Sequence, residues 1–279
     1  MKAYTDLIKQ ALAEDIGGGD HTSLSCIPSD AVGKAHLLVK QDGIIAGVEV
    51  ALEVFRIVDS NLKVEVLIQD GSKVSVGDIA FVVSGKSQSI LIAERLALNF
   101  MQRMSGIATH TAHLKGLIGP FKAKLLDTRK TTPNNRIFEK MAVKIGGGEN
   151  HRFGLYDMVM IKDNHIDYAG GIKAAISKTK KYLANNNIDI RIEVEARNLS
   201  EVETILGAEK VDRIMLDNFS YSDLTEAVAM IGSYAETEAS GGITEETIAE
   251  YAKCGVDYIS VGALTHQINS LDLSLKAID

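Results

Sequence analysis

The spacing of four apolar segments in the second half of the chain constrains the fold more than any other feature. These segments end at residues 195, 217, 239 and 261, so each end follows the previous one by 22 residues. A strand, a helix and two short connections fill such an interval. The repeat predicts parallel strands joined by helical crossovers and closed into a barrel, rather than a fold built from hairpins.

Six strands are predicted in this half of the chain. They cover residues 124–127, 158–162, 190–195, 213–217, 235–239 and 258–261. Between them, apolar side chains recur at helical spacing, as in Ile172, Ile176 and Leu183. Because a complete barrel of this type has eight strands, we predict an α/β fold with an incomplete barrel over residues 106–265.

The first 105 residues read as a separate α/β domain. Short β-rich runs lie between residues 35 and 83, and helical spacing marks residues 4–14, 48–58 and 90–104. The composition changes at Ser105-Gly106, where we place the domain boundary. The C-terminal residues 266–279 are too few for a domain, and we expect them to join the first one.

Two charged stretches of this N-terminal domain allow a functional and a structural interpretation. Glu14 to Thr22 contains acids and a histidine that could bind a metal, but its three consecutive glycines favour a flexible loop. Arg95 lies beside Glu94 in the predicted helix, and spacing alone favours a solvated ion pair.

Composition and charge limit the kind of protein. The 279 residues carry a formal charge of -7, and 46% of them are apolar, which excludes a disordered chain. Residues 127–165 nevertheless contain seven Lys/Arg against five Asp/Glu, which indicates a site for a small anion rather than a nucleic-acid surface. No apolar run is long enough to span a membrane. Cys26 and Cys254 make no disulfide framework, so we expect a cytoplasmic protein.

Charged residues follow the predicted strands at the ends where a parallel barrel has its active site. These strand ends carry Asp127, Thr128, Arg129 and Lys130; Lys162 to His165; Glu193 and Glu195; and Asp217. Glu193 and Glu195 share a face of their strand because they are two residues apart. Two buried carboxylates need cationic partners, and we predict Lys130 and Lys162 for this role.

Two glycine turns follow the last two strands and predict a phosphate site. Ser240-Gly241-Gly242 is expected to precede a helix with apolar residues Ile243 and Ile248, and Val261-Gly262-Ala263 follows the final strand. Backbone N–H groups at the start of a helix bind phosphate, and many barrels place phosphate after their late strands.

Three longer motifs resemble those of the quinolinate phosphoribosyltransferases, also called carboxylating nicotinate-nucleotide pyrophosphorylases. They are Asp127 to Pro133, Gly146-Gly147-Gly148 with Asn150-His151-Arg152, and Ile161 to His165. Shorter motifs follow in the order of the family over nearly the whole chain, among them Ser105 to Thr109 and Leu216-Asp217-Asn218-Phe219. The sequence departs at Asn134-Asn135, where the family usually has glycine after the proline; asparagine also tolerates left-handed backbone.

The resemblance implies a reaction and an assembly. Quinolinate and phosphoribosyl pyrophosphate would give nicotinate mononucleotide, carbon dioxide and pyrophosphate in NAD biosynthesis, with Mg²⁺. The N-terminal α/β domain would be sandwich-like and the barrel would have about seven strands. A homodimer, or a higher assembly of dimers, would complete each active site with Arg95 of the other subunit, and neither nucleic acid nor a membrane would be a partner.

The same resemblance assigns roles to the candidate residues. Thr128, Arg129, His151, Arg152 and Lys162 would hold the two carboxylates of quinolinate, with arginine acting in bidentate fashion. Glu195 and Asp217 would hold the ribose hydroxyls, bind Mg²⁺ and lie near the cationic ribose. Phosphates would be bound by Lys130, by Ser240, Gly241 and Gly242, and by Val261, Gly262 and Ala263. Lys130, Glu195 and Asp217 would be the catalytic residues, and no covalent nucleophile is required.

Three alternatives stay open from the sequence. A related transferase encoded beside molybdenum-transport genes would use another substrate, although a neutral substrate would not need this set of cations. An aldolase would use Lys130 or Lys162 to form a Schiff base. A barrel without enzymatic activity would bind a dicarboxylate or phosphate without releasing pyrophosphate.

Overall fold

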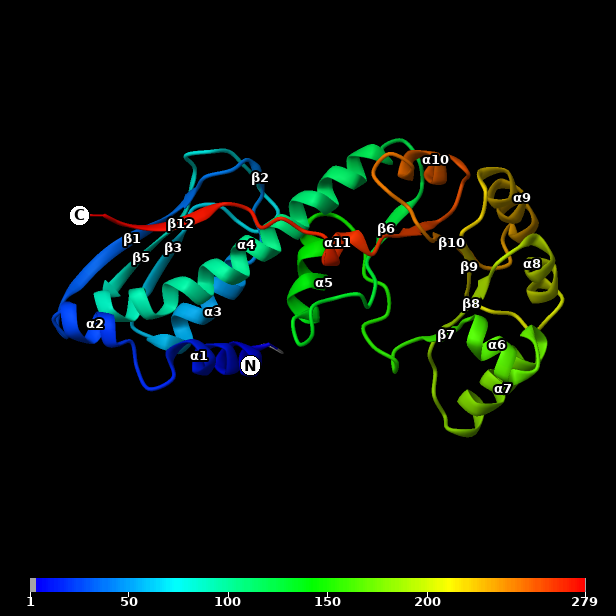
Figure 1. The fold of residues 1–279 in the computed structure, drawn as a ribbon, viewed down its shortest axis with the longest axis horizontal. Coiled ribbons are helices and arrows are strands. Elements are labelled where there is room, and N and C mark those ends of the chain that lie inside the picture. Colours follow the sequence, from blue (N-terminus) through cyan, green and yellow to red (C-terminus); the bar gives the residue numbers. More distant parts are fainter. Residues whose placement is uncertain (1–3, 279) are drawn as a thin grey trace. The chain divides into compact units, whose positions relative to one another are not determined.

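The computed structural model describes residues 4–278 and divides the chain into two compact units (Figure 1). The first unit comprises the chain up to Ala112, Thr131–Gly147 and the chain from Ala263. The second comprises His113–Lys130 and Gly148–Gly262. The composition change at Ser105-Gly106 lies inside the continuous helix α4 (Ser87–Leu117), which the sequence had predicted to end at residue 104.

One antiparallel sheet organises the first unit. Its strands follow the order β12 (Leu273–Ile278), β1 (Val32–Val39), β5 (Ile79–Lys86) and β3 (Lys63–Val66). β2 (Gly43–Ile44) pairs with β4 (Lys73–Val74). The C-terminal strand lies against β1, with Leu275 opposite Leu37, so the last part of the chain belongs to the same sheet as its beginning.

Helices of the first unit pack on this sheet and on one another through apolar contacts. α3 (Val48–Val58) contacts β5 through the rings of Phe55 and Phe81, whose centroids are 5.8 Å apart. α4 contacts α5 (Arg136–Ile145) through Phe100 and Phe138, at 4.4 Å. α1 (Thr5–Ile16) joins α3 through a buried hydrogen bond of 2.9 Å from Thr5 to Glu53, and α11 (Ala263–His266) completes the unit.

The loop predicted between Glu14 and Thr22 is shorter than expected. Helix α2 (His21–Cys26) begins inside it, because the Asp20 carboxylate accepts the Ser23 N–H at 3.1 Å and caps the helix. Only the glycine turn before Asp20 behaves as predicted.

The second unit contains the predicted parallel sheet. Its strand order is β6 (Lys124–Leu126), β11 (Tyr258–Ser260), β10 (Glu236–Ser240), β9 (Arg213–Asp217), β8 (Ile192–Ala196) and β7 (Val159–Ile161). All of these neighbours pair in parallel, and all six predicted strands are confirmed within two residues. A single parallel bridge between Leu126 and Glu149 extends the ladder beyond β6, so a full seventh strand does not form in the described residues.

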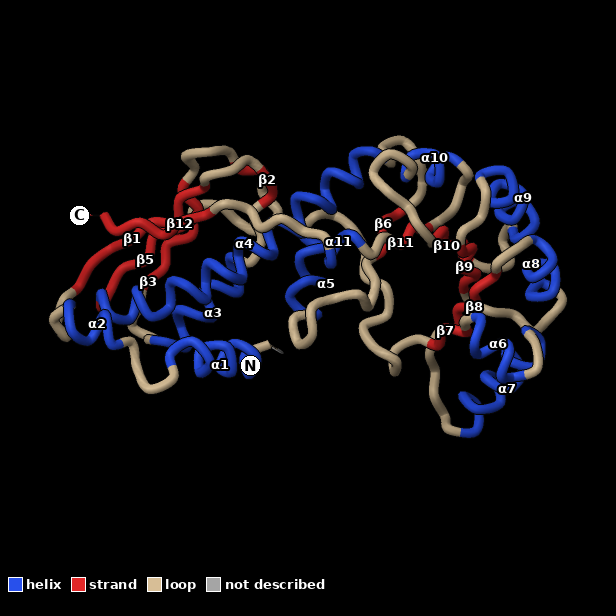
Figure 2. Tube along the Cα trace, viewed as in Figure 1, coloured by secondary structure: helices blue, strands red, loops and turns tan. Residues whose placement is uncertain are grey.

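The strands form an arc with the helices on its outer side (Figure 2). These helices are α6 (Asp163–Ala169), α7 (Ile172–Asn185), α8 (Leu199–Leu206), α9 (Tyr221–Ile231) and α10 (Ile248–Lys253). Val194, Leu216 and Ala239 are completely buried on one face of the strands. Most of the alternate positions, such as Glu193, Glu195, Arg213, Asp217 and Glu238, are charged, although Met215 lies among them, so this face of the strands is largely polar.

No helix within residues 4–278 is both long and apolar enough to cross a membrane. Cys26 and Cys254 are both free thiols, as the sequence predicted.

Two glycines of helix α4 provide a matched test of its packing. A Cβ atom on Gly106 would lie 2.2 Å from the Asn269 carbonyl oxygen, whereas a Cβ on Gly116 would meet nothing within 4 Å. Gly106→Ala should therefore lower the free energy of unfolding by about 1–3 kcal/mol. Gly116→Ala should raise it by up to about 1 kcal/mol, because alanine favours a helix. Urea unfolding of both variants measures the difference; equal effects would show that Asn269 does not pack against α4.

Candidate active site

The predicted site residues of the second unit lie at the carboxyl ends of its strands. Thr128, Arg129 and Lys130 follow β6, and the Thr128 hydroxyl accepts the Lys130 N–H at 3.0 Å. Lys162 follows β7 and caps helix α6. Glu195 and Asp217 lie at the ends of the neighbouring strands β8 and β9. Parallel pairing places these ends on one rim of the barrel.

The predicted cationic partner is confirmed for Glu195 and wrong for Glu193. Lys162 Nζ lies 3.2 Å from Glu195 Oε2, and the Glu195 carboxylate is almost buried. Glu193 instead lies 2.9 Å from His151 Nε2. Glu193 lies one inward-facing position deeper in the barrel than Glu195. Lys162 pairs with Glu195 at the rim, and the loop residue His151 contacts Glu193 below it.

Arg129 and Arg152 are 23 positions apart in the chain, but they lie close enough for the charge of Arg129 to act on Arg152. Burial lowers the pKa of Arg152 first, and the positive charge of Arg129 lowers it further. The Arg152 guanidinium donates to the Met158 carbonyl at 3.2 Å, which holds its side chain at one end. Two guanidinium groups brought together in this way form a site that an anion would stabilise.

Asp217 is fixed by hydrogen bonds from two neighbouring residues. Ser240 Oγ donates to one carboxylate oxygen at 2.6 Å, and Asn218 Nδ2 donates to the other at 2.7 Å. The Asn218 N–H also donates to the Ser240 carbonyl at 2.9 Å. The β9 and β10 ends are therefore joined into one rigid polar group.

The turn after β10 requires glycine, but it does not lead directly into a helix as predicted. Gly241 has φ +95°, and a Cβ there would lie 2.2 Å from the Asn218 side-chain oxygen. Gly242 also has positive φ, +60°, which favours glycine. Helix α10 begins only at Ile248, because Thr244 to Thr247 form a hydrogen-bonded turn. Any phosphate contact at Ser240–Gly242 would come from the turn's own N–H groups and not from a helix dipole.

The second glycine turn starts from a residue whose N–H is already used. The Val261 N–H donates to the Leu126 carbonyl at 3.0 Å and continues the sheet. Gly262 closes the second unit, and Ala263 begins α11 in the first.

Comparisons with known proteins decide the family. Residues 20–105 match the model of the quinolinate phosphoribosyl transferase N-terminal domain, and residues 107–276 match that of the C-terminal domain. The chain belongs to the quinolinate phosphoribosyltransferase family. It is 48% identical to quinolinate phosphoribosyltransferase [decarboxylating] 1b of Nicotiana tabacum, over 97% of this chain and 81% of that protein.

Bacterial members of the family are similar in sequence and in structure. The probable nicotinate-nucleotide pyrophosphorylase [carboxylating] of Bacillus subtilis is 39% identical, over 96% of this chain and 91% of that protein. The crystal structure of NadC from Streptococcus pyogenes has a TM-score of 0.93 at 38% identity, covering 99% of this chain and 97% of that one.

Two residues singled out in the sequence lie in the first unit. Arg95 is exposed on α4, and it belongs to a different unit from the residues at the barrel rim. Asn134 has φ +62°, so it adopts the left-handed backbone that was predicted where the family usually has glycine.

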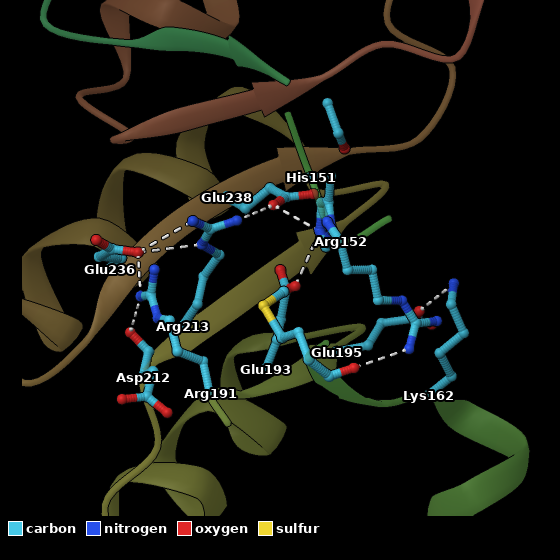
Figure 3. A network of polar contacts seen from close by, with 12 residues as sticks. His151, Arg152, Lys162, Arg191, Glu193, Glu195, Asp212, Arg213, Glu236 and Glu238 are labelled. Carbon is cyan, nitrogen blue, oxygen red and sulfur yellow. Dashed lines mark hydrogen bonds and ion pairs between the residues drawn. The ribbon is translucent and has the colours of Figure 1, made fainter. Parts of the chain in front are cut away.

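A buried cluster beneath the rim joins three strands and one loop (Figure 3). His151 Nε2 lies 2.9 Å from Glu193 Oε2 and 3.4 Å from Glu238 Oε2, and both carboxylates are completely buried. Arg213 donates to Glu238 at 3.0 Å and to Glu236 at 3.1 Å, and its guanidinium lies 4.1 Å from the centre of the Tyr258 ring. The candidate ligand atoms of His151, Glu193 and Glu238 all lie within 4.8 Å of one another.

These neighbours shift the pKa values of the cluster. Burial disfavours a charged ring, but Glu193 and Glu238 outweigh it and raise the pKa of His151 to about 9. Burial and the Glu238 charge raise the pKa of Glu193 to about 7. The Arg152 N–H donates to His151 Nδ1 at 2.6 Å and so opposes a second proton on the ring. The proton that the raised pKa values imply is therefore shared by the whole cluster, between His151 Nε2 and the carboxylates of Glu193 and Glu238.

Sequence reasoning missed Arg213, Glu236 and Glu238. Their signal was present, because Arg213 shares the parity of Asp217, and Glu236 and Glu238 share the parity of Ser240. Pairing them required the strand register, in which Arg213 lies opposite both Glu193 and Glu236.

The His151 cluster predicts a decrease in stability as pH rises from about 6.5 to about 9. The pKa of His151 is about 9 in the native state, against 6.5 for an exposed imidazole. Between these two pH values the native state therefore binds more protons than the unfolded state. The contribution is fully present below about 6.5, and its loss lowers the free energy of unfolding by at most about 1.4 kcal/mol per pH unit. Urea unfolding of the wild type and of His151→Gln measures this slope. The variant should have the flatter profile; the same slope in both would contradict the assignment.

Proposed function

We propose that this chain transfers phosphoribosyl from phosphoribosyl pyrophosphate to quinolinate with loss of carbon dioxide, giving nicotinate mononucleotide and pyrophosphate. It belongs to the quinolinate phosphoribosyltransferase family, whose Nicotiana members are named as decarboxylating enzymes. The cations at one strand-end rim carry the proposal. Arg129 follows β6, and Lys162 follows β7 with its ammonium 3.2 Å from Glu195. Quinolinate has two carboxylates that need such groups.

Quinolinate would lie against the cations that follow β6 and β7 and against the loop before β7. Arg129, Arg152 and Lys162 would pair with its carboxylates, with Thr128 beside them. Lys162 is already held by Glu195, so its ammonium is oriented before substrate arrives. Preorganised charge of this kind lowers the cost of binding and of the reaction.

Phosphoribosyl pyrophosphate would lie across the ends of β8 to β11. Glu195 and Asp217 would accept the ribose hydroxyls and stabilise the positive charge that develops as the bond between C1 and pyrophosphate breaks. Lys130 and the turns Ser240–Gly242 and Val261–Ala263 would bind the phosphates. Once the ring nitrogen is quaternised, the pyridinium can accept the electrons left by decarboxylation.

Glu195 and Asp217 fit a magnesium ion by their chemistry. Mg²⁺ prefers oxygen ligands and needs only one or two carboxylates besides phosphate oxygens. Both side chains already accept hydrogen bonds, yet each carboxylate has further lone pairs. When bound, the ion would neutralise charge on the pyrophosphate.

The alternatives have less support. A Schiff-base aldolase needs a neutral lysine, whereas Lys162 is paired with a carboxylate at 3.2 Å. A barrel that only binds anions has no need of the Glu195 and Asp217 carboxylates beside its cations. We further infer a homodimer with shared sites. We also infer a cytoplasmic location, which two free cysteines favour, although some plant relatives are named as mitochondrial or chloroplastic.

Substrate choice tests the carboxylate site. Quinolinate should be turned over, whereas nicotinate should react poorly. Nicotinate lacks the carboxylate next to the ring nitrogen and would cover a rim cation without pairing it. The cost of such a loss is about 2–5 kcal/mol. Pyrophosphate release with each acid, compared as kcat/KM, measures it. Comparable turnover of nicotinate would overturn the assignment.

Mixing two inactive variants tests whether the subunits share their sites. Arg95→Ala and Lys130→Ala should each lose about 10²–10³-fold in activity. If Arg95 acts on the partner's barrel, a mixed dimer has one intact site and one with both lesions. Random exchange makes about half of the dimers mixed, so activity should recover to about a quarter of wild type.

The control for this mixing experiment is subunit exchange between two wild-type preparations carrying different tags. No recovery despite proven exchange, or a monomer in sedimentation, would reject the shared site.

A further inference from the structure

Both ring nitrogens of His151 face groups of the protein. Nδ1 accepts the Arg152 N–H at 2.6 Å, and Nε2 lies 2.9 Å from Glu193 and 3.4 Å from Glu238. The side chain is 4% exposed. A quinolinate carboxylate would need a ring N–H to bind, and this ring directs its polar edge to Glu193 and Glu238 instead.

Glu238 is itself held by a chain of ion pairs through the barrel (Figure 3), and Glu193 lies opposite Arg213 in the strand register. Arg213 joins Glu238 to Glu236, and Arg191 reaches Glu236 from the amino end of the sheet. Both carboxylates are fully buried, and Glu238 cannot turn away from His151 without losing Arg213. The carboxylates of Glu193 and Glu238, which lie deeper in the barrel, therefore determine the position of the His151 imidazole.

The charges of this chain of ion pairs favour a proton over a metal ion. Three carboxylates, those of Glu193, Glu236 and Glu238, face two guanidinium groups, leaving one negative charge. One proton shared with His151 cancels it, whereas a divalent ion would leave an excess positive charge in a buried place. His151 Nε2 thus faces two carboxylates as their charge partner.

We propose that His151 is a positioning residue for Arg152, held by Glu193 and Glu238, rather than a group that contacts quinolinate. The proposal rests on the proposed function, since it concerns how that enzyme's arginine is oriented. It adds Glu193 and Glu238 to the groups that determine the affinity for quinolinate.

Three contacts fix Arg152 in this arrangement. Its N–H donates to the His151 ring, the preceding N–H of His151 donates to buried Asp127 at 2.8 Å, and its guanidinium donates to the Met158 carbonyl. A long flexible side chain loses rotamer entropy when it binds an anion. Fixing its backbone and its head in advance reduces that loss and aligns the guanidinium for bidentate pairing.

Double-mutant cycles test the proposal in the full-length enzyme. His151→Gln alone should lower kcat/KM for quinolinate by about 10–100-fold, the effect of a small misplacement, while KM for phosphoribosyl pyrophosphate stays unchanged. In an Arg152→Ala background the same substitution should cost less than about 3-fold, because the residue through which it acts is gone. Glu193→Gln should behave in the same way. Losses that multiply in the double variants would show direct contact and overturn the proposal.

A matched control separates positioning from a general loss of stability. Asp257→Ala removes the carboxylate that accepts hydrogen bonds from the Thr237 N–H and hydroxyl at the amino end of the same barrel. It should lower the melting temperature without raising KM for quinolinate. A similar rise of KM in this control would mean that any weakening of the barrel mimics the effect, and the proposal would fail.

Nitrogen-15 NMR of the seven histidines tests the same point in the wild type, without relying on variants that fold. The His151 ring proton should be recognised by slow exchange, and its nitrogen shifts should persist when quinolinate is saturating. A large shift of either nitrogen on binding would demonstrate contact with the substrate. Absence of quinolinate turnover by the wild type would instead reject the proposed function, and it would be seen before any variant is made.

Discussion

The ion pair between Arg213 and Glu238 is the constraint on which the interior of the barrel depends. Parallel barrels usually fill their interior with Val, Ile and Leu, whereas this one buries charges on β8, β9 and β10. Buried carboxylates are tolerated only when cations and hydrogen-bond donors compensate for lost water. Arg213 lies between Glu193 and Glu236 in the strand register and reaches Glu238 as well, so one guanidinium compensates several acids.

The buried charges inside the barrel orient the side chains at the rim. Glu193 and Glu238 direct His151, and His151 is followed immediately by Arg152, which approaches Arg129. One inward position higher on β8, Glu195 holds Lys162. The charged residues of the rim are thus the upper layer of a stack of alternating charges. Under the proposed function, such a rim would be ordered before substrate arrives, which suits a reaction that depends on electrostatic stabilisation.

Much of this could be predicted from the sequence, because its signals are local. The spacing of buried runs located all six parallel strands, and the family motifs located Arg129, Arg152 and Lys162. The length of α4 could not be predicted, since Gly106 resembles a break in the helix but is instead required by the close approach of Asn269. The partner of Glu193 could not be predicted either, because it depends on which loop lies above β8. The prediction that a helix begins directly after Gly242 was wrong. Thr244 to Thr247 form a hydrogen-bonded turn, and the helix begins only at Ile248.

The pairing of β12 with β1 has a consequence for the order in which the molecule can be built. β12 follows the whole second unit in the chain, yet it lies beside the first strand, with Leu275 opposite Leu37. During synthesis, the barrel's six strands leave the ribosome before the first unit receives its last strand. The early sheet must persist with β1 as an open edge, which can pair with other chains. Contacts this distant in sequence also form slowly. A chaperone that shields an exposed strand would therefore find its substrate in the half of this protein that is made first.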